Sequence, residues 1–284
     1  MAEPGHGTGV ERPLDSVGPG TIALLGIPFD EHSSFLNGAA LAPRQIRAVL
    51  HSGETNLSAE SGADLGRESR LKDVGDLVLE RGAGALVQIE HAVAGLLSRG
   101  ARVLSLGGDH AVTLPILRAH AKEYDSLNIL HLDAHPDLYD EFEGDRYSHA
   151  CPFARIMEER LASRLVQVGI RAMNPHQRVQ AQRLGVEVVD MRHWSPGFQP
   201  RFDGPVYLSL DLDVLDPAFA PGVSHHEPGG LSTREVIGLV QRLEGPLVGA
   251  DIVELNPERD VVDMTAMAAA KLLKEIVAKM LDSG

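Results

Sequence analysis

The chain has 284 residues, 43% of them hydrophobic, and a formal net charge of −14. This size and apolar content allow one large domain with a substantial core, while the negative charge argues against a nucleic-acid partner, because phosphates require a basic face, and favours a cationic ligand. Cys151 is the only cysteine, so an internal disulfide is impossible and any metal would have to be held by oxygen and nitrogen.

The N-terminal stretch MAEPGHGTGVERPLDSVGPG has neither the basic start nor the apolar centre of a signal peptide. We interpret residues 1–20 as a disordered segment and residues 21–284 as one catalytic domain. No later apolar run approaches the ~18 residues that a membrane span needs. The sequence therefore predicts a cytoplasmic protein with no membrane attachment.

Short apolar runs alternate with helical segments along the rest of the chain. The runs predict strands at residues 21–27, 71–74, 102–106, 127–132, 165–169, 186–189, 206–210 and 247–251. Apolar residues at three- and four-residue spacing predict helices at 44–50, 84–98, 111–123, 150–160, 175–184, 233–242 and 264–281. Such alternation is typical of a parallel sheet covered on both faces. We expect a single-domain, three-layer α/β/α fold with a mostly parallel sheet of about eight strands.

Acidic and histidine side chains end three of these apolar runs. They close VLSLGGDH at residues 103–110, ILHLDAHPD at 129–137 and SLDLD at 209–213. The carboxyl ends of parallel strands meet at one edge of the sheet, where α/β proteins bind ligands. We therefore expect the three ends to converge on a metal site, with the strand-following loops at 28–38, 171–174 and 252–260 as its walls.

In the segment DAHPD, ligand-type side chains occupy alternate positions. If the preceding strand continues, Asp133, His135 and Asp137 share one face. Asp211 and Asp213 are likewise two residues apart and are expected to share a face.

His110 adds a second imidazole, so the set has four carboxylates and two histidines. This exceeds the needs of one zinc ion, and its oxygen content suits manganese, so two carboxylate-bridged ions fit better. Two ions about 3.5–4 Å apart lower the pKa of a shared water, which implies hydrolysis. Outside this set, Asp216 is interpreted as a turn residue, and His51, His120 and His176 as surface residues.

The three motifs resemble those of the ureohydrolase superfamily, which comprises arginases, agmatinases and related guanidino-group hydrolases. They are GGDH at residues 107–110, DAHPD at 133–137 and DLDVLDP at 211–217. The similarity spans nearly all the chain, and plant-type arginases share further stretches such as YSHACPFARIME and GADIVELNPERD. The resemblance implies two Mn²⁺ ions per chain, one held by His110, Asp133, Asp137 and Asp211 and the other by Asp133, His135, Asp211 and Asp213.

The resemblance also implies that hydroxide between the ions attacks the guanidinium carbon of a small cationic substrate, releasing urea and an amine. Glu254 matches the carboxylate that orients the guanidinium, and His149 matches a proton shuttle to the leaving amine. Asp137 is counted with them as a catalytic residue. Asn174 and Ser148 are expected to contact the substrate together with Glu254 and His149.

The chain departs from animal-type arginases at the amino-acid end of the substrate. Leu138 stands where they carry an asparagine, and Asn174 lies near the position of an aspartate. The acidic loop at 140–145 could bind a terminal amine or be a solvated face, and His225 and His226 could contact ligand or face solvent.

We expect an arginase that converts L-arginine to L-ornithine and urea. Agmatinase, or another guanidino-acid hydrolase, is the main alternative. A zinc deacetylase of the same general fold, or an inactive homologue, is less favoured because the ligand set is complete. Members of the superfamily are commonly trimers or hexamers, so the resemblance implies a homo-oligomer.

Overall fold

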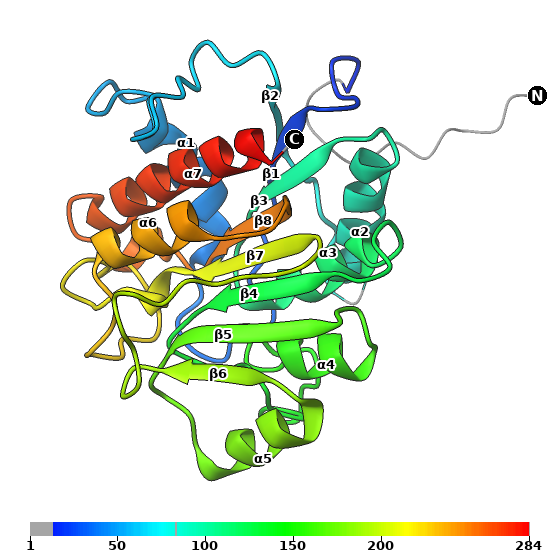
Figure 1. Ribbon diagram of the computed structural model, residues 1–284, viewed down its shortest axis with the longest axis vertical. Coiled ribbons are helices and arrows are strands. Elements are labelled where there is room, and N and C mark those ends of the chain that lie inside the picture. The colour runs from blue at the N-terminus through cyan, green and yellow to red at the C-terminus, as the bar shows by residue number, and fades with distance from the viewer. Residues whose placement is uncertain (1–13, 83, 284) are drawn as a thin grey trace, which may run out of the picture.

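The computed structural model describes residues 14–82 and 84–283, and these form one sheet with helices on both faces (Figure 1). Its eight strands are β1 Ile22–Gly26, β2 Leu71–Asp76, β3 Arg102–Leu106, β4 Asn128–Leu132, β5 Arg164–Ile170, β6 Glu187–Asp190, β7 Val206–Asp211 and β8 Leu247–Val253. The α-helices are α1 Ala42–Leu50, α2 Gly84–Leu97, α3 Thr113–His120, α4 Pro152–Glu158, α5 Pro175–Leu184, α6 Thr233–Arg242 and α7 Met264–Asp282. Short 3-10 helices are η1 Ala39–Leu41, η2 His110–Val112, η3 Leu212–Val214 and η4 Pro257–Arg259. The predicted three-layer fold is confirmed, with element ends displaced by a few residues.

The strand order is β2-β1-β3-β8-β7-β4-β5-β6, and every neighbouring pair is parallel. Strands β3 and β4 follow each other along the chain, yet β8 and β7 lie between them in the sheet. All eight carboxyl ends therefore share one edge, and those of β3, β8, β7 and β4 lie side by side at its centre.

Two apolar cores lie on the two faces of the sheet. Helices α1, α6 and α7 cover one face, and α2, α3, α4 and α5 cover the other (Figure 1). Successive side chains of a strand point to opposite faces, so on β7 Leu208 belongs to the core that contains Leu272 of α7, whereas Tyr207 belongs to the core that contains Ile89 of α2. Each fully buried side chain of this size contributes about 1.5–3 kcal/mol, so the sheet is a rigid support for the loops at its edge.

Residues 1–20 were expected to be disordered. Of these, residues 1–13 lie outside the described residues. Near the end of this segment, Leu14 and Val17 are buried in the α2-side core. The ordered chain therefore begins before residue 21. In the described part of the chain, no helix is long and apolar enough to cross a membrane.

The three histidines expected at the surface do not all lie there. His51 and His176 are exposed, as predicted. His120 is fully buried at the end of α3, where its ring stacks on Tyr124 and meets Tyr207 edge-on. Its pKa falls to about 4 because burial disfavours the charged imidazolium, so the prediction for His120 is wrong.

Candidate metal centre

The predicted ligands lie at the carboxyl ends of neighbouring central strands. His110 follows β3, Asp133 follows β4, and Asp211 ends β7. These strands bring the side chains together because parallel strands end at the same edge. Side chains from the three sequence motifs thus lie together in one compact cluster.

The first donor set surrounds the His110 ring. Its Nδ1 lies 3.2 Å from Asp133 Oδ2, 3.0 Å from Asp137 Oδ2 and 3.2 Å from Asp211 Oδ2. This nitrogen is buried and has no hydrogen-bond partner among the described residues. Donor atoms in neighbouring positions around a divalent ion with ~2.1 Å bonds lie about 3 Å apart. The spacing is therefore that of metal ligands around a common centre.

The second donor set lies beside the first and shares one residue with it. His135 Nδ1 lies 2.9 Å from Asp213 Oδ2 and 3.5 Å from Asp133 Oδ1. Asp133 therefore presents Oδ2 to the first set and Oδ1 to the second. A carboxylate shared in this way is suited to bridge two ions.

The ligands converge although the strand does not continue, so the condition for a shared strand face of Asp133, His135 and Asp137 is not met. Strand β4 ends at Leu132, and Asp137 has a left-handed φ of 50°. The loop is closed instead by carboxylates that accept backbone N–H groups, Asp133 Oδ1 from His135 at 2.5 Å and Asp213 Oδ1 from Ala134 at 3.0 Å. Asp213 Oδ2 and Asp133 Oδ2 remain free of these backbone bonds, whereas Asp133 Oδ1 both accepts the His135 N–H and faces the second donor set.

The turn after β7 is built in the same way. Asp211 ends the strand and caps η3, because its Oδ1 accepts the N–H of Asp213 at 2.7 Å. Asp213 thus lies in a 3-10 helix and not on the strand face. Asp216 accepts N–H groups from Ala218, Gly229 and Gly230 at 3.0, 2.7 and 3.1 Å, which confirms its turn role.

Electrostatics within the cluster call for a cation. Burial, with repulsion from neighbouring carboxylates, raises the pKa of Asp211 well above its usual range and that of Asp213 to about 6. Buried carboxylates that repel one another are stabilised by a positive charge. Hard oxygen donors with two imidazoles and no thiolate fit a pair of divalent ions of the manganese class.

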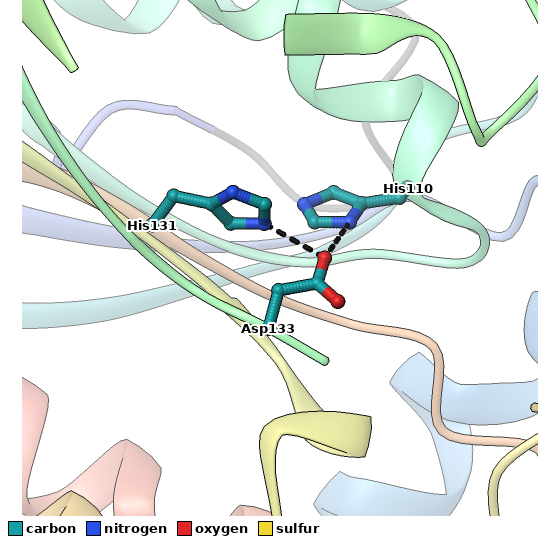
Figure 2. Close-up of side chains that lie close together, drawn as sticks. All are labelled: His110, His131 and Asp133. Atoms are coloured by element: carbon teal, nitrogen blue, oxygen red, sulfur yellow. Dashed lines mark hydrogen bonds and ion pairs between the residues drawn. The ribbon is translucent and has the colours of Figure 1, made fainter. Parts of the chain in front are cut away.

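His131 also belongs to this cluster, although the sequence analysis did not single it out. Its Nε2 lies 2.7 Å from Asp133 Oδ2, and Figure 2 shows that carboxylate between the rings of His110 and His131. These three residues are close enough to form a candidate metal-binding group. The signal available in the sequence was a histidine two positions before the DAHPD motif.

A buried hydrogen-bond chain fixes the orientation of His110. Asp251 accepts hydroxyl groups from Ser209, Thr113 and Tyr207, each at 2.8 Å. Because Ser209 Oγ donates to Asp251, it accepts from His110 Nε2, which lies 2.9 Å away. His110 therefore carries its proton on Nε2 and turns the Nδ1 lone pair toward the carboxylates. Sequence reasoning missed these partners, which lie within strands β7 and β8 and, for Thr113, at the start of α3.

Glu254 and His149 form a buried pair beside the donor sets. Glu254 Oε1 lies 2.8 Å from His149 Nδ1 and accepts the N–H of His110 at 2.8 Å. Burial lowers the pKa of His149, but the Glu254 carboxylate outweighs it and raises that pKa to about 9. Burial conversely raises the pKa of Glu254, and His149 brings it below its usual value. On the far side of the ring, Nε2 lies 2.8 Å from Ser34 Oγ and 3.2 Å from the Ser34 N–H.

These groups line a cavity of about 170 Å³ at the edge of the sheet. Its walls are Ser34, His135, Asp137, Tyr139, Phe142, His149, Ala150, Ala172, Gln177, Asp211, Asp213, His225 and Glu254. The loops at 28–38, 171–174 and 252–260 each contribute one of them, as predicted.

Several expected contacts lie elsewhere. Asn174 is not in the cavity wall, because its side chain caps α5 and donates to Tyr139 Oη at 2.7 Å. Ser148 is buried outside the wall, and its substrate role stays a prediction. His225 lines the cavity, whereas His226 is exposed and lies 2.7 Å from the carbonyl oxygen of Pro221.

A parallel α/β/α fold with two linked carboxylate–histidine donor sets and a buried glutamate beside a cavity defines a ureohydrolase. The chain belongs to the arginase family, since residues 20–278 match the family model described as Arginase family. The sequence-based recognition and the expectation of an enzyme are confirmed.

Individual relatives place the chain nearer to plant arginases than to an agmatinase. "Arginase 1, mitochondrial" of Arabidopsis thaliana is 47% identical over 276 residues, covering 91% of this chain and 80% of the relative. The solved arginase of Medicago truncatula superposes with a TM-score of 0.87 at 43% identity, covering 92% of this chain and 87% of that one. An agmatinase of Bacillus anthracis is 34% identical, covering 90% of both chains.

The predicted cytoplasmic location is wrong in the light of these comparisons. Several of the plant arginases that match this chain are named as mitochondrial or as chloroplastic/mitochondrial proteins. The lack of a secretory signal pattern does not bear on organellar location, because a transit peptide has a different composition.

Proposed function

We propose that this protein binds two Mn²⁺ ions and hydrolyses L-arginine to L-ornithine and urea. In this proposal the residues of the first donor set hold one ion, and His135, Asp213, Asp133 and Asp211 hold the other. When bound, the ions supply hydroxide near neutral pH by lowering the pKa of a shared water. The observation that carries the proposal is the sharing of Asp133 by two donor sets that open on one cavity with Glu254.

Glu254 is proposed to orient the guanidinium. Its Oε1 is already bonded to His110 and His149, whereas no hydrogen bond within the described residues uses Oε2. A planar guanidinium binds well to a carboxylate, and Glu254 lines the cavity. Its backbone has a left-handed φ of 66°, so the local chain conformation, together with the two bonds to Oε1, sets the direction of the side chain.

His149 is proposed to carry a proton to the leaving amine. The Ser34 hydroxyl beside Nε2 can donate to the neutral ring or accept from the imidazolium. The hydroxyl therefore serves both protonation states, as a proton relay requires, whereas the Ser34 N–H, which donates to Nε2 at 3.2 Å, serves the neutral ring. Ser34 and His149 both line the cavity, so the proton is available where the amine would depart.

The tail of the substrate is proposed to be recognised by neutral donors. The cavity wall contains no lysine or arginine among the described residues. Gln177 is buried in that wall, and no hydrogen bond within the described residues uses its Nε2. A free amide N–H suits the α-carboxylate of arginine, so Gln177 is proposed as its partner.

The acidic loop at 140–145 gives little support to agmatine. Asp145 lies 2.6 Å from His32 Nδ1, and Asp140 lies 3.3 Å from a guanidinium nitrogen of Arg183. Gln180 also donates to Asp140 at 2.5 Å. Because these carboxylates already have partners, a terminal ammonium group would have to displace them. The identity with arginases adds to this preference for L-arginine.

Parallel urea assays with arginine, agmatine and 4-guanidinobutyrate test the proposal, together with metal analysis of the same sample. We expect two manganese ions per chain and the highest kcat/KM with arginine. The variant Glu254→Gln should keep both ions and lose turnover.

Other results would select another function. Faster urea release from agmatine would indicate an agmatinase, and about one zinc per chain without urea would favour a deacetylase. A manganese-loaded chain that releases no urea from any of the three would refute the proposal. From the resemblance we also propose a homo-oligomer, a trimer or hexamer, which light scattering would measure.

A further inference from the structure

His131 is a fully buried histidine whose hydrogen bonds converge on the shared ligand Asp133. It lies on β4 directly beside Gln167 of β5, as its parallel register partner. One side of its ring faces Asp133 Oδ2 at 2.7 Å, and the other side faces Gln167 Nε2 at 3.0 Å. The ring therefore links the sheet interior to the metal centre.

The orientation of the Gln167 amide decides where His131 carries its proton. Gln167 Nε2 donates to the carbonyl oxygen of Pro136 at 2.6 Å, so the nitrogen and not the amide oxygen must face that acceptor. Its second hydrogen then points to His131 Nδ1, which must accept. Gln167 Oε1 is left buried without a hydrogen-bond partner among the described residues. The two hydrogen bonds of Nε2 therefore have to offset the cost of this unsatisfied oxygen.

His131 is consequently a donor toward Asp133. With Nδ1 accepting, the proton of the neutral ring lies on Nε2 and is given to Asp133 Oδ2. The ring cannot turn away easily, because it stacks on Phe153 with 3.8 Å between ring centroids and meets His110 edge-on at 5.0 Å. Figure 2 shows His131 and His110 approaching the same carboxylate from two sides.

The contact matters because Asp133 is the residue that both donor sets share. Its Oδ1 is held by the N–H of His135 at 2.5 Å, and its Oδ2 by His131. We propose that His131, oriented by Gln167, is a positioning residue that locks the Asp133 carboxylate toward both donor sets and so retains the metal ions. The inference rests on the metal-binding part of the proposed function.

The test compares Mn²⁺ release to a chelator from the loaded protein and its variants, with unfolding of each metal-free protein measured alongside. His131→Leu removes the donor, whereas His131→Gln keeps an N–H near the position of Nε2. His120→Leu is the matched control, since His120 is also fully buried and aromatic-packed but contacts none of the ligands. Mutating a residue that hydrogen-bonds to a metal ligand typically lowers metal affinity about 10–100-fold.

We expect release to be about 10–100-fold faster in His131→Leu, with His131→Gln nearer to wild type and His120→Leu unchanged. Gln167→Met leaves His131 in place but frees its tautomer, so it should also release Mn²⁺ faster. Should His131→Leu fold poorly, Gln167→Met carries the test.

Wild-type release rates in His131→Leu or Gln167→Met would overturn the inference, as would equal losses in His131→Gln and His131→Leu, since ring packing would then be responsible. A wild-type protein that binds no divalent ion would instead overturn the proposed function.

Discussion

The pair between His149 and Glu254 makes the stability of the metal-free protein depend on pH. Glu254 raises the pKa of His149 to about 9, against 6.5 for an unperturbed ring. The pair therefore stabilises the fold fully below pH 6.5, where both states bind the proton, and this contribution is lost as the pH rises through 9. The pKa of His149 is about 2.5 higher in the folded protein, and each pKa unit is worth ~1.36 kcal/mol. The pair therefore adds about 3 kcal/mol to the free energy of unfolding at pH 6 and about 2 kcal/mol at pH 7.5.

The assay is urea unfolding of wild type, His149→Ala and His120→Ala in the presence of a chelator, at pH 6, 7.5 and 9.5. Both variants lose a buried imidazole and its packing. The pKa of His120 is lowered to about 4 by burial, so this ring stays neutral over the whole range. We expect the destabilisation by His149→Ala to shrink by about 3 kcal/mol between pH 6 and 9.5, while that by His120→Ala grows by about 1 kcal/mol, because only the unfolded state of His120 takes up a proton at pH 6.

A destabilisation by His149→Ala that is flat or grows with pH would refute this reasoning. It would mean that His149 is neutral in the folded protein below pH 9 and that Glu254 is not its charge partner. A pH dependence of the same size in His120→Ala would assign the effect to the rest of the protein.

Three further predictions concern the candidate metal ligands, the recognition of the substrate tail and the turn after β7. Asp133→Asn and Asp211→Asn should abolish activity by losing metal, whereas His149→Ala should slow turnover with metal bound; a fully loaded Asp211→Asn protein would contradict its ligand role. Gln177→Leu should raise KM for arginine about 10–100-fold, as loss of a hydrogen bond to a charged group predicts, but leave KM for agmatine unchanged; parallel kinetics with both substrates check this. Asp216→Ala should lower the free energy of unfolding by about 1–3 kcal/mol, because three backbone N–H groups lose their acceptor; unchanged manganese content would distinguish this effect from metal loss.

The fold could be predicted because buried parallel strands read as unbroken apolar runs. Strand β3 was predicted with both ends correct. The observed β7 and β8 are longer than predicted by one and two residues, at the ends that lie in the site. In β7 the missing residue is the polar Asp211, and in β8 the missing Ile252 and Val253 are apolar but follow the carboxylate of Asp251. A carboxylate inside a strand ends the apolar pattern before it ends the strand.

The candidate ligands could be predicted because their type and order carry the chemistry. Their geometry could not, since the turn after Leu132 depends on a contact between Asp213 and the N–H of Ala134, 79 residues apart in the chain. The polar partners were missed for a related reason. His131 and Gln167 sit within strands, and only the register that pairs them shows that they form one hydrogen-bond chain.

The strand order has a consequence for folding during synthesis on the ribosome. His110 and Asp133 are synthesised close together, but β7 and β8 must later insert between their strands. An emerging chain that lacks its last eighty or so residues would hold β3 and β4 without the two strands that carry Asp211, Asp213 and Glu254. Non-local pairings of this kind form late. Capture of the proposed metal ions should therefore mark the completion of folding, and truncated chains should bind these ions more weakly than the full chain.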